Sequence, residues 1–302
     1  MKSKKTPFFS IVIPTLNEEK YLPILLKDLT AQTNSDFEII VVDGHSADKT
    51  VSKAKTFSSK LNLTVVNHSV RNVCVQRNSG AAQAKAFWLL FLDADNRLPP
   101  YFIQGLRYQI DKSHPEIFTT FVSFDSHHPL DKTLSQIINA FFLTQQKVAY
   151  PSIFESCLGI TNANFKKISG FDPTRKWSEG RDLLHRLYTH NIMLKVFKEP
   201  IYTGSLRRLR KEGSLKLIRN FAPLILADIT GTKLDPAVYQ KFYPMLGGGA
   251  FKKPSKPSTQ LEKIIIDLIK KYRVLETIEK LNQPIIIPKN PFAKLFGKLN
   301  RH

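Results

Sequence analysis

Short apolar runs recur along the first hundred residues and are separated by segments of mixed polarity. The runs at residues 8–13, 37–42, 63–66 and 87–92 are rich in β-branched and aromatic side chains. Continuous apolar runs of this length predict strands that are buried on both faces, as in a parallel sheet. Parallel strands need a crossover between them, and the usual crossover is a helix.

The segments between these runs suit helices. Apolar residues recur three and four positions apart in residues 21–32, and residues 49–58 and 76–86 are also interpreted as helical. Asn17 is expected to cap the first of these helices, with Glu18 in its first turn. The alternation of strand and helix predicts an α/β fold with a doubly wound, mostly parallel sheet and helices on both faces.

Two carboxylates follow the apolar run at residues 87–92. Asp93 and Asp95 are expected just past the carboxyl end of this strand, where open α/β sheets bind their ligands. A divalent cation placed between these carboxylates and a phosphate would make use of their charge. The alternative is a turn, since Asp is common after strands. This stretch by itself leaves both interpretations open.

The composition indicates a globular protein with an anionic partner. Apolar residues make up 42% of the 302 residues, which is ample for a packed core, and the net charge is +20. Nucleotide phosphates, nucleic acid or an anionic membrane face would match this charge. Cys74 and Cys157 are too few for a disulfide framework or a zinc site, so a reducing compartment is expected. Neither an export signal nor a spanning helix is predicted, which favours a cytoplasmic, soluble or peripheral protein.

The middle of the chain is expected to enlarge the sheet. Residues 117–124, 156–164 and 194–197 are interpreted as strands, and residues 201–204 as a further short strand. Residues 134–148 are helix-like in composition. The second half of the sheet is therefore predicted to be mixed rather than purely parallel.

Four segments of this chain resemble one known family. They are residues 10–18, residues 40–43 with Ser46 and Asp48, Arg77-Asn78-x-Gly80, and residues 91–95 with their Asp-x-Asp pair. In this order and at these spacings they resemble the nucleotide-binding half of the family 2 glycosyltransferases, which have the GT-A fold. The match covers about residues 8–110, and a looser match continues to about Leu187.

The resemblance implies a binding site for a nucleotide-sugar donor. The first strand-end loop would border the nucleoside, Asp43 would contact the base or ribose, and Arg77 would lie beside the nucleotide. The residues implied in donor binding are Pro14, Thr15, Asn17, Glu18, Asp43, Ser46, Arg77, Asn78, Asp93, Asp95, Arg207 and Arg208. For Arg207 and Arg208 a lipid phosphate, an anionic surface or plain solvent exposure are open alternatives.

The same resemblance implies a Mn²⁺ or Mg²⁺ ion at the Asp-x-Asp pair. Asp95 would hold the metal that bridges the diphosphate, and Asp93 would face the ribose and serve as the second candidate ligand. Such a cation takes one or two protein carboxylates and fills its shell with water and substrate phosphates. It would then act as a Lewis acid on the departing nucleoside diphosphate.

The catalytic base is less clearly marked. Inverting members of this family use a carboxylate at the start of a helix, usually in the pattern Glu-Asp, two residues, Asp-Leu. Here Glu179 matches the Glu and Asp182 the downstream acid, but Gly180 stands where the catalytic Asp is expected. Glu179 is our first candidate because of its longer side chain, and Asp182 is the second. Both also suit a helix N-terminus, where acids are stabilised by the helix dipole.

The chain is predicted to consist of two parts. Residues 1–212 form the glycosyltransferase domain, with a nucleotide-sugar half at about 8–110 and an acceptor half at about 111–212. Residues 213–302 form a basic, mainly helical region with a linker near 247–258. Its amphipathic helix at about residues 261–281 either lies on a membrane surface or packs on the catalytic domain, and we favour the membrane.

The resemblance therefore implies a transferase of the EC 2.4 class, metal-dependent and inverting. It would move a sugar from a UDP- or GDP-sugar to an acceptor hydroxyl, with a lipid-linked or cell-envelope glycan as a candidate acceptor. A nucleotidyltransferase is disfavoured because residues 14–18 lack a Gly-rich phosphate loop. The alternative is a nucleotide-, polyanion- or membrane-binding module without transferase activity, and no nucleic-acid partner is expected.

Overall fold

The computed structural model describes residues 6–125, 129–146, 151, 153–175 and 178–207. Within these ranges the strands form one seven-stranded sheet in the order β3-β2-β1-β4-β6-β5-β7. The strands are β1 (Phe9–Thr15), β2 (Phe37–Asp43), β3 (Leu63–Asn67), β4 (Trp88–Leu92), β5 (Ile117–Phe124), β6 (Cys157–Thr161) and β7 (Leu194–Gly204). Strand β6 is antiparallel to β4 and β5, whereas the other described pairs are parallel. The predicted α/β class with a mostly parallel sheet is confirmed.

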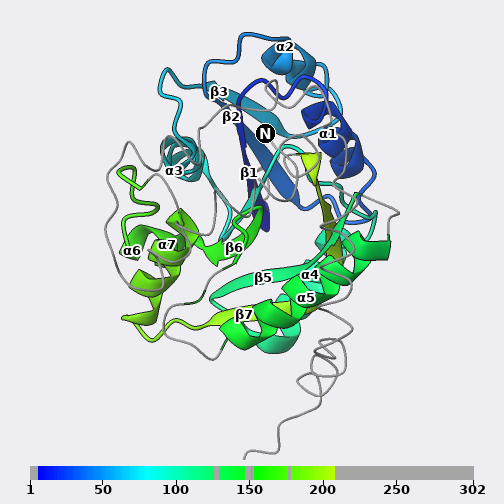
Figure 1. Cartoon of the computed structure of the whole chain (residues 1–302). Coiled ribbons are helices and arrows are strands. Elements are labelled where there is room, and N and C mark those ends of the chain that lie inside the picture. The colour runs from blue at the N-terminus through cyan, green and yellow to red at the C-terminus, as the bar shows by residue number, and fades with distance from the viewer. Residues whose placement is uncertain (1–5, 126–128, 147–150, 152, 176–177, 208–302) are drawn as a thin grey trace, which may run out of the picture.

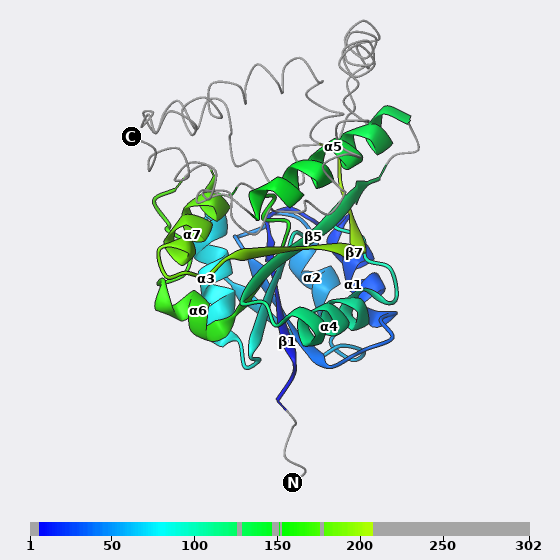
Figure 2. The same ribbon diagram turned by 90° about the horizontal axis from the view of Figure 1, so that it is seen from below.

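The helices cover both faces of this sheet. They are α1 (Leu22–Thr30), α2 (Thr50–Lys55), α3 (Val73–Gln83), α4 (Phe102–Ser113), α5 (Pro129–Gln145), α6 (Asn162–Lys167) and α7 (Glu179–Tyr188). Helices α3, α6 and α7 lie on one side of the sheet, and α1, α2 and α4 lie on the other (Figure 1 and Figure 2). Helix α5 runs beside β5. Both faces of β1, β2 and β4 are therefore buried, as their continuous apolar runs predict.

The chain order places a switch point between β1 and β4. From β1 the chain moves outward through β2 to β3 and then returns to β4 on the other side of β1. Ligands of open α/β sheets bind at such a point, outside the carboxyl ends of the strands. Because β1, β2 and β4 are parallel, their carboxyl ends meet at one edge.

Helix α3 approaches the sheet closely at Gly80. A Cβ on this glycine would lie 2.4 Å from Cγ1 of Val12 and 3.1 Å from Cγ2 of Val42. Any larger side chain would push α3 away from β1 and β2, because such distances are shorter than ordinary packing contacts. The glycine of the Arg77-Asn78-x-Gly80 segment therefore brings Arg77 close to the sheet edge.

Three local expectations are wrong. Asn17 does not cap α1, which has Tyr21 at its N-cap position without a side-chain hydrogen bond. Residues 162–164 do not continue β6 but begin α6, because Thr161 Oγ1 accepts a hydrogen bond from the N–H of Asn164 and caps that helix. The two short strands expected at residues 194–204 are one strand, β7, whose pairing with β5 shifts register between Thr120 and Val122.

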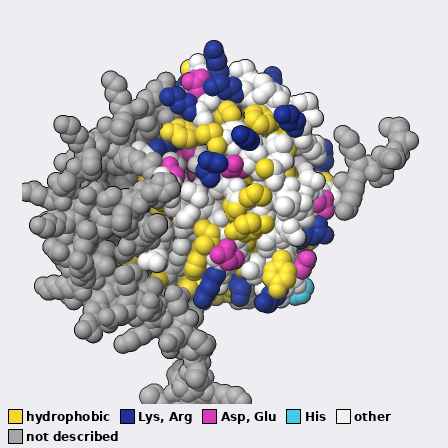
Figure 3. Space-filling view, turned by 90° about the vertical axis from the view of Figure 1, so that its right-hand side faces the viewer, with side chains coloured by type: hydrophobic (Ala, Val, Ile, Leu, Met, Phe, Trp, Pro, Cys, Tyr) yellow, Lys and Arg dark blue, Asp and Glu magenta, His cyan; other side chains and the backbone are white. Residues whose placement is uncertain are grey.

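The basic side chains visible on one face do not form a single patch. On the side shown in Figure 3, lysine and arginine side chains lie dispersed among apolar and neutral ones. Among the described residues, no helix has the length and apolar character needed to cross a membrane. The predicted basic helix, the linker near 247–258 and Arg208 lie outside the described residues.

Candidate active site

The loops after β1 and β2 are joined at the carboxyl edge of the sheet. Thr15 is paired in register with Asp43, and its Oγ1 donates a hydrogen bond of 3.0 Å to that carboxylate. Ser46 donates to Asp43 from both its backbone N–H (2.8 Å) and its hydroxyl (2.6 Å). The Asp43 side chain is 2% exposed, so these hydrogen bonds compensate for its loss of water. Three sequence-predicted donor-binding residues therefore lie together.

Asn17 does not cap a helix but connects the same two loops through hydrogen bonds. Its backbone N–H donates to the Ser46 hydroxyl at 2.7 Å, and its side-chain oxygen accepts from the N–H of Ala47 at 2.8 Å. The residue has a φ of 55°, in the left-handed region that Asn tolerates better than most residues. Asn17 thereby holds the loop after β1 against the loop after β2.

Gln76 is a structural member of this edge that the sequence did not single out. Its side-chain nitrogen donates to the carbonyl oxygens of Thr15 and Val42, each at 2.8 Å. The residue is 4% exposed and adds a hydrogen bond to each of two strand-end carbonyls, which also accept from the N–H of Gly44 and the hydroxyl of Thr15. No feature of the sequence around Gln76 signals this role, because it depends on how α3 is placed over β1 and β2.

Arg77 forms ion pairs with carboxylates from two distant segments of the chain. Its Nη2 lies 3.1 Å from Oδ1 of Asp93, and its Nη1 lies 3.2 Å from Oε1 of Glu179. The guanidinium, with its side chain 3% exposed, also lies 5.2 Å from the ring centroid of Phe171. A buried guanidinium needs such partners to offset its desolvation. Arg77 therefore links the Asp-x-Asp pair to the start of α7.

Arg207 binds the other half of the Asp-x-Asp pair. Its two terminal nitrogens donate to the two carboxylate oxygens of Glu18 at 2.7 and 2.6 Å, a bidentate pair. Its Nε lies 2.9 Å from Oδ2 of Asp95, and its guanidinium carbon lies 4.7 Å from the ring centroid of Tyr21. The last described residue of the chain thus returns to the loop after β1.

The carboxylates of this edge fit a hard divalent cation in their chemistry. Burial raises the pKa of Asp95 to about 7, although the Arg207 guanidinium acts in the opposite direction. Burial also raises the pKa of Glu18. Cations lower both values, and in this structure Arg207 supplies the positive charge. Among the described residues no cluster of three or more potential metal-ligating His, Cys, Asp or Glu side chains is found.

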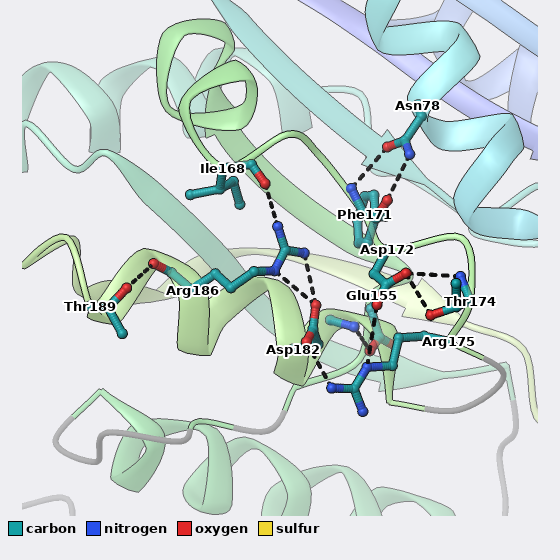
Figure 4. Close-up of polar contacts among 11 residues, drawn as sticks. Asn78, Glu155, Ile168, Phe171, Asp172, Thr174, Arg175, Asp182, Arg186 and Thr189 are labelled. Atoms are coloured by element: carbon teal, nitrogen blue, oxygen red, sulfur yellow. Dashed lines mark hydrogen bonds and ion pairs between the residues drawn. The ribbon is translucent and has the colours of Figure 1, made fainter.

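The two predicted base candidates lie in different surroundings. Glu179 is the first residue of α7 and belongs to the Arg77 cluster. Asp182 lies between two arginines, 3.0 Å from Nη2 of Arg175 and 2.8 Å from Nη2 of Arg186 (Figure 4). The structure therefore brings Glu179 to the strand-end carboxylates and engages Asp182 in an ion-pair group on the other side of α7.

Asn78 is fully engaged with the turn before α7. Its side-chain nitrogen donates to the carbonyl of Phe171 at 2.7 Å, and its oxygen accepts from the N–H of the same residue at 2.9 Å (Figure 4). Both polar groups of this amide are thereby occupied by one backbone unit. Asn78 fixes the Gly170-Phe171-Asp172 turn against α3.

Glu155 is a further acidic residue of the site that the sequence did not indicate. Its Oε1 accepts a hydrogen bond of 2.8 Å from the N–H of Gly180, and its backbone carbonyl lies 3.5 Å from Nη2 of Arg77. Burial and the charge of Glu179 raise its pKa to about 8, with Arg77 acting in the opposite direction. Nothing in the segment around Glu155 resembles a known pattern, since only the fold brings it to α7.

Comparison with known proteins gives a consistent picture. The family model described as glycosyl transferase family 2 matches residues 10–201. A PGL/p-HBAD biosynthesis glycosyltransferase of Mycobacterium tuberculosis is 42% identical over 94 residues, which are 30% of this chain and 37% of that protein. An uncharacterized glycosyltransferase of Haemophilus influenzae is 29% identical over 208 residues, 64% of this chain and 63% of that protein.

One relative is similar to this chain both in sequence and in structure. The poly(ribitol-phosphate) beta-N-acetylglucosaminyltransferase TarS of Staphylococcus aureus is 32% identical over 113 residues, 36% of this chain and 20% of that protein. Its fragment 1–349 in complex with UDP has a TM-score of 0.54 at 20% identity, covering 78% of this chain and 69% of that one. The chain spans less than two thirds of the length of each curated relative named here.

A second solved structure covers more of the chain. The mannosyltransferase PcManGT of Pyrobaculum calidifontis, in complex with GDP-Man and Mn²⁺, has a TM-score of 0.58 at 16% identity. The likeness covers 92% of this chain and 85% of that one. At this level of identity the likeness concerns the fold, which is the mixed α/β arrangement of these glycosyltransferases.

Proposed function

Because this chain belongs to glycosyl transferase family 2, we propose that it transfers a sugar from a nucleotide-diphosphate sugar to an acceptor hydroxyl. The donor is a UDP- or GDP-sugar, and the transfer inverts the anomeric carbon by a single displacement. Solved relatives of this fold are described in complex with UDP, UDP-GlcNAc and GDP-Man, which supports a donor of this class.

The proposal rests on one observation above the others. The ends of β1, β2 and β4 bring three aspartates to one edge of the sheet, Asp43, Asp93 and Asp95, beside Arg77 and Arg207. This edge is the switch point where open sheets bind nucleotides. We propose that Asp43 and its partners Thr15 and Ser46 border the base or ribose, and that Arg207 approaches the diphosphate.

The proposal includes a Mn²⁺ or Mg²⁺ ion at the Asp-x-Asp pair. We propose that Asp95 holds it, with Asp93 as the second ligand, and that it supplies a Lewis acid for the departing diphosphate. In this step the chain's own residues would orient the donor through the strand-end loops. One solved relative of similar fold is described with Mn²⁺, which supports the choice of metal.

The acceptor hydroxyl must give its proton to a carboxylate within hydrogen-bond reach. Of the two candidates taken from the sequence, Glu179 reaches the Arg77 cluster and Asp182 is held by Arg175 and Arg186. We propose that Glu179 belongs to the catalytic centre and that Asp182 stabilises α7. The names of two relatives point to cell-envelope glycans, so we propose an acceptor of that class, met at a membrane surface.

The experiment is a binding and turnover panel with the full chain. UDP-glucose, UDP-GlcNAc and GDP-mannose are titrated with and without Mn²⁺, and release of UDP or GDP is followed with water as the acceptor. We expect Mn²⁺-dependent binding of one donor, and Asp95→Asn is expected to abolish its metal-dependent part because the variant lacks the ligating charge. Asp111→Asn, on the exposed face of α4, is the matched control.

Two outcomes would contradict the proposal. Unchanged Mn²⁺-dependent affinity in Asp95→Asn would remove the metal assignment. Binding of anionic vesicles or polyanions without binding of any nucleotide sugar would instead favour a non-enzymatic module, an alternative that Gly180 keeps open because it replaces the expected acid.

A further inference from the structure

The space beside Gly180 is filled by a side chain from another part of the chain. A Cβ built on Gly180 would lie 2.4 Å from both Cγ and Oε1 of Glu155, and 2.7 Å from its Cδ. These separations are much shorter than van der Waals contact, so both side chains cannot occupy this place at once. The carboxyl group of Glu155 thus stands where a side chain on residue 180 would begin.

The backbone of α7 orients this carboxylate. Gly180 lies in the first turn of α7, where backbone N–H groups have no acceptor within the helix. Its N–H donates to Oε1 of Glu155 at 2.8 Å, and Figure 4 shows Glu155 beside this end of the helix. The carboxylate is therefore held at the start of α7, where the family resemblance implies an aspartate that acts as the catalytic base.

The backbone next to Glu155 is bound to the Asp-x-Asp segment. The N–H of Asp93 donates to the carbonyl of Ser156 at 3.1 Å, and the side chain of Asn96 donates to the same carbonyl at 2.5 Å. The hydroxyls of Ser156 and Tyr202 lie 2.7 Å apart. Glu155 is therefore fixed close to the carboxylates proposed to hold the donor, although it is far from them in sequence.

We propose that Glu155 is the general base of the transfer reaction and replaces the aspartate that is absent at position 180; this inference rests on the proposed function. The Glu155 carboxylate takes the proton of the acceptor hydroxyl while the acceptor oxygen forms a bond to the anomeric carbon. The bond from that carbon to the diphosphate oxygen breaks, and its electron pair leaves with the nucleoside diphosphate. The proton then passes from Glu155 to solvent.

Glu155 suits this role better than Glu179 for two reasons. Glu179 is paired with the buried Arg77 at 3.2 Å, and protonating it would leave that guanidinium without one of its partners. The raised pKa of Glu155, about 8, lies close to neutral pH, which suits a group that both accepts and returns a proton. Glu179 is then a positioning residue that holds Arg77.

The first test compares Glu155→Gln with wild type on the nucleotide sugar that the wild-type chain hydrolyses fastest in the panel. The amide can still accept the Gly180 hydrogen bond, so donor affinity is expected to stay unchanged. Turnover is expected to fall about 100- to 10,000-fold. The wild-type turnover is expected to rise with pH up to about 8, and this rise should be absent from the pH–rate profile of Glu155→Gln. Glu116→Gln, an exposed glutamate before β5, is the matched control.

The second test moves the carboxylate. Glu155→Ala removes the base, and Glu155→Ala with Gly180→Asp returns an acid to the vacated space; the double variant is expected to recover turnover by about tenfold or more over Glu155→Ala. Wild-type turnover in Glu155→Gln overturns the inference, as does a double variant no faster than Glu155→Ala. If the wild-type chain binds no donor in the panel, the proposed function itself is wrong. If it binds and hydrolyses a donor but Glu155→Gln keeps wild-type turnover, only the role of Glu155 is wrong.

Discussion

The two arginines at the sheet edge pair with carboxylates in different environments. The Arg77 side chain is 3% exposed and binds Asp93 and Glu179, whereas the Arg207 side chain is 15% exposed and binds Glu18 and Asp95. Each arginine takes one member of the Asp-x-Asp pair. Arg77 comes from the middle of α3, but Arg207 follows the last strand of the sheet.

The difference separates a structural cation from one at the rim of the site. Arg77 is enclosed by α3, β4 and α7, so its partners are set by the packing of these elements. Arg207 reaches the edge from a short segment beyond β7 and is more accessible. We therefore expect Arg77 to contribute mainly to folding, and Arg207 to be the arginine that can exchange a carboxylate for a donor phosphate.

The largest effect is expected for Arg77→Met. Removing the guanidinium leaves Glu179, whose side chain is 15% exposed, without its counter-charge, while Asp93, 39% exposed, can turn to water. Because the lost cation is itself buried, the free energy of unfolding should fall by about 3–5 kcal/mol. Urea unfolding of the full chain, followed by circular dichroism, measures this change. Arg107→Met is the control: Arg107 pairs with Asp36 and its side chain is 38% exposed, so a loss of about 1 kcal/mol or less is expected.

A smaller loss of stability is expected for Arg207→Met. The Arg207 side chain is 15% exposed, against 3% for Arg77, so water can replace part of its interactions with Glu18 and Asp95. The free energy of unfolding should therefore fall by about 1–2 kcal/mol. Donor affinity in the nucleotide-sugar titration should fall as well. If this variant loses as much stability as Arg77→Met, the distinction between the two arginines is wrong.

A further effect concerns the dependence of the free energy of unfolding on pH, through Glu155 beside Arg77. The pKa of Glu155 is about 8 in the folded protein against 4.5 in the unfolded chain, so the folded state binds the proton more tightly. The stability that this proton contributes is complete below about pH 4.5 and is lost as the pH rises through 8. Between pH 5 and pH 8.5 the free energy of unfolding of wild type should therefore fall relative to Glu155→Gln, by at most about 4 kcal/mol, since each unit of pKa difference corresponds to about 1.4 kcal/mol.

Asp172 provides the control for this pH effect because its shift has the opposite sign. Hydrogen bonds from Thr174 lower the pKa of Asp172, so its contribution is present at neutral pH and is lost only in acid. Asp172→Asn should leave the slope between pH 5 and pH 8.5 unchanged. If the free energy of unfolding depends on pH equally in wild type and Glu155→Gln, Glu155 is not held as a neutral acid in this pH range.

Much of the donor half could be predicted because its signals are local. An apolar run that ends in Asp93 and Asp95 indicates both a buried strand and the edge at which its ligand binds, and the same holds for Asp43 after β2. The prediction that Asn17 caps α1 was wrong for a reason that is not local. Its left-handed backbone turns its amide toward Ala47, in a loop that comes from a different part of the chain.

The sequence by itself determined the alternation of strands and helices in the first hundred residues, the family of this chain and the positions of the strand-end carboxylates. These follow from patterns within a few residues, namely side-chain periodicity and the polar residues that end each strand. Only the tertiary structure decided which arginine neutralises which aspartate, and that Glu155 fills the space left by Gly180. Such pairings depend on how closely α3, β6 and α7 pack, and no spacing along the chain encodes that distance.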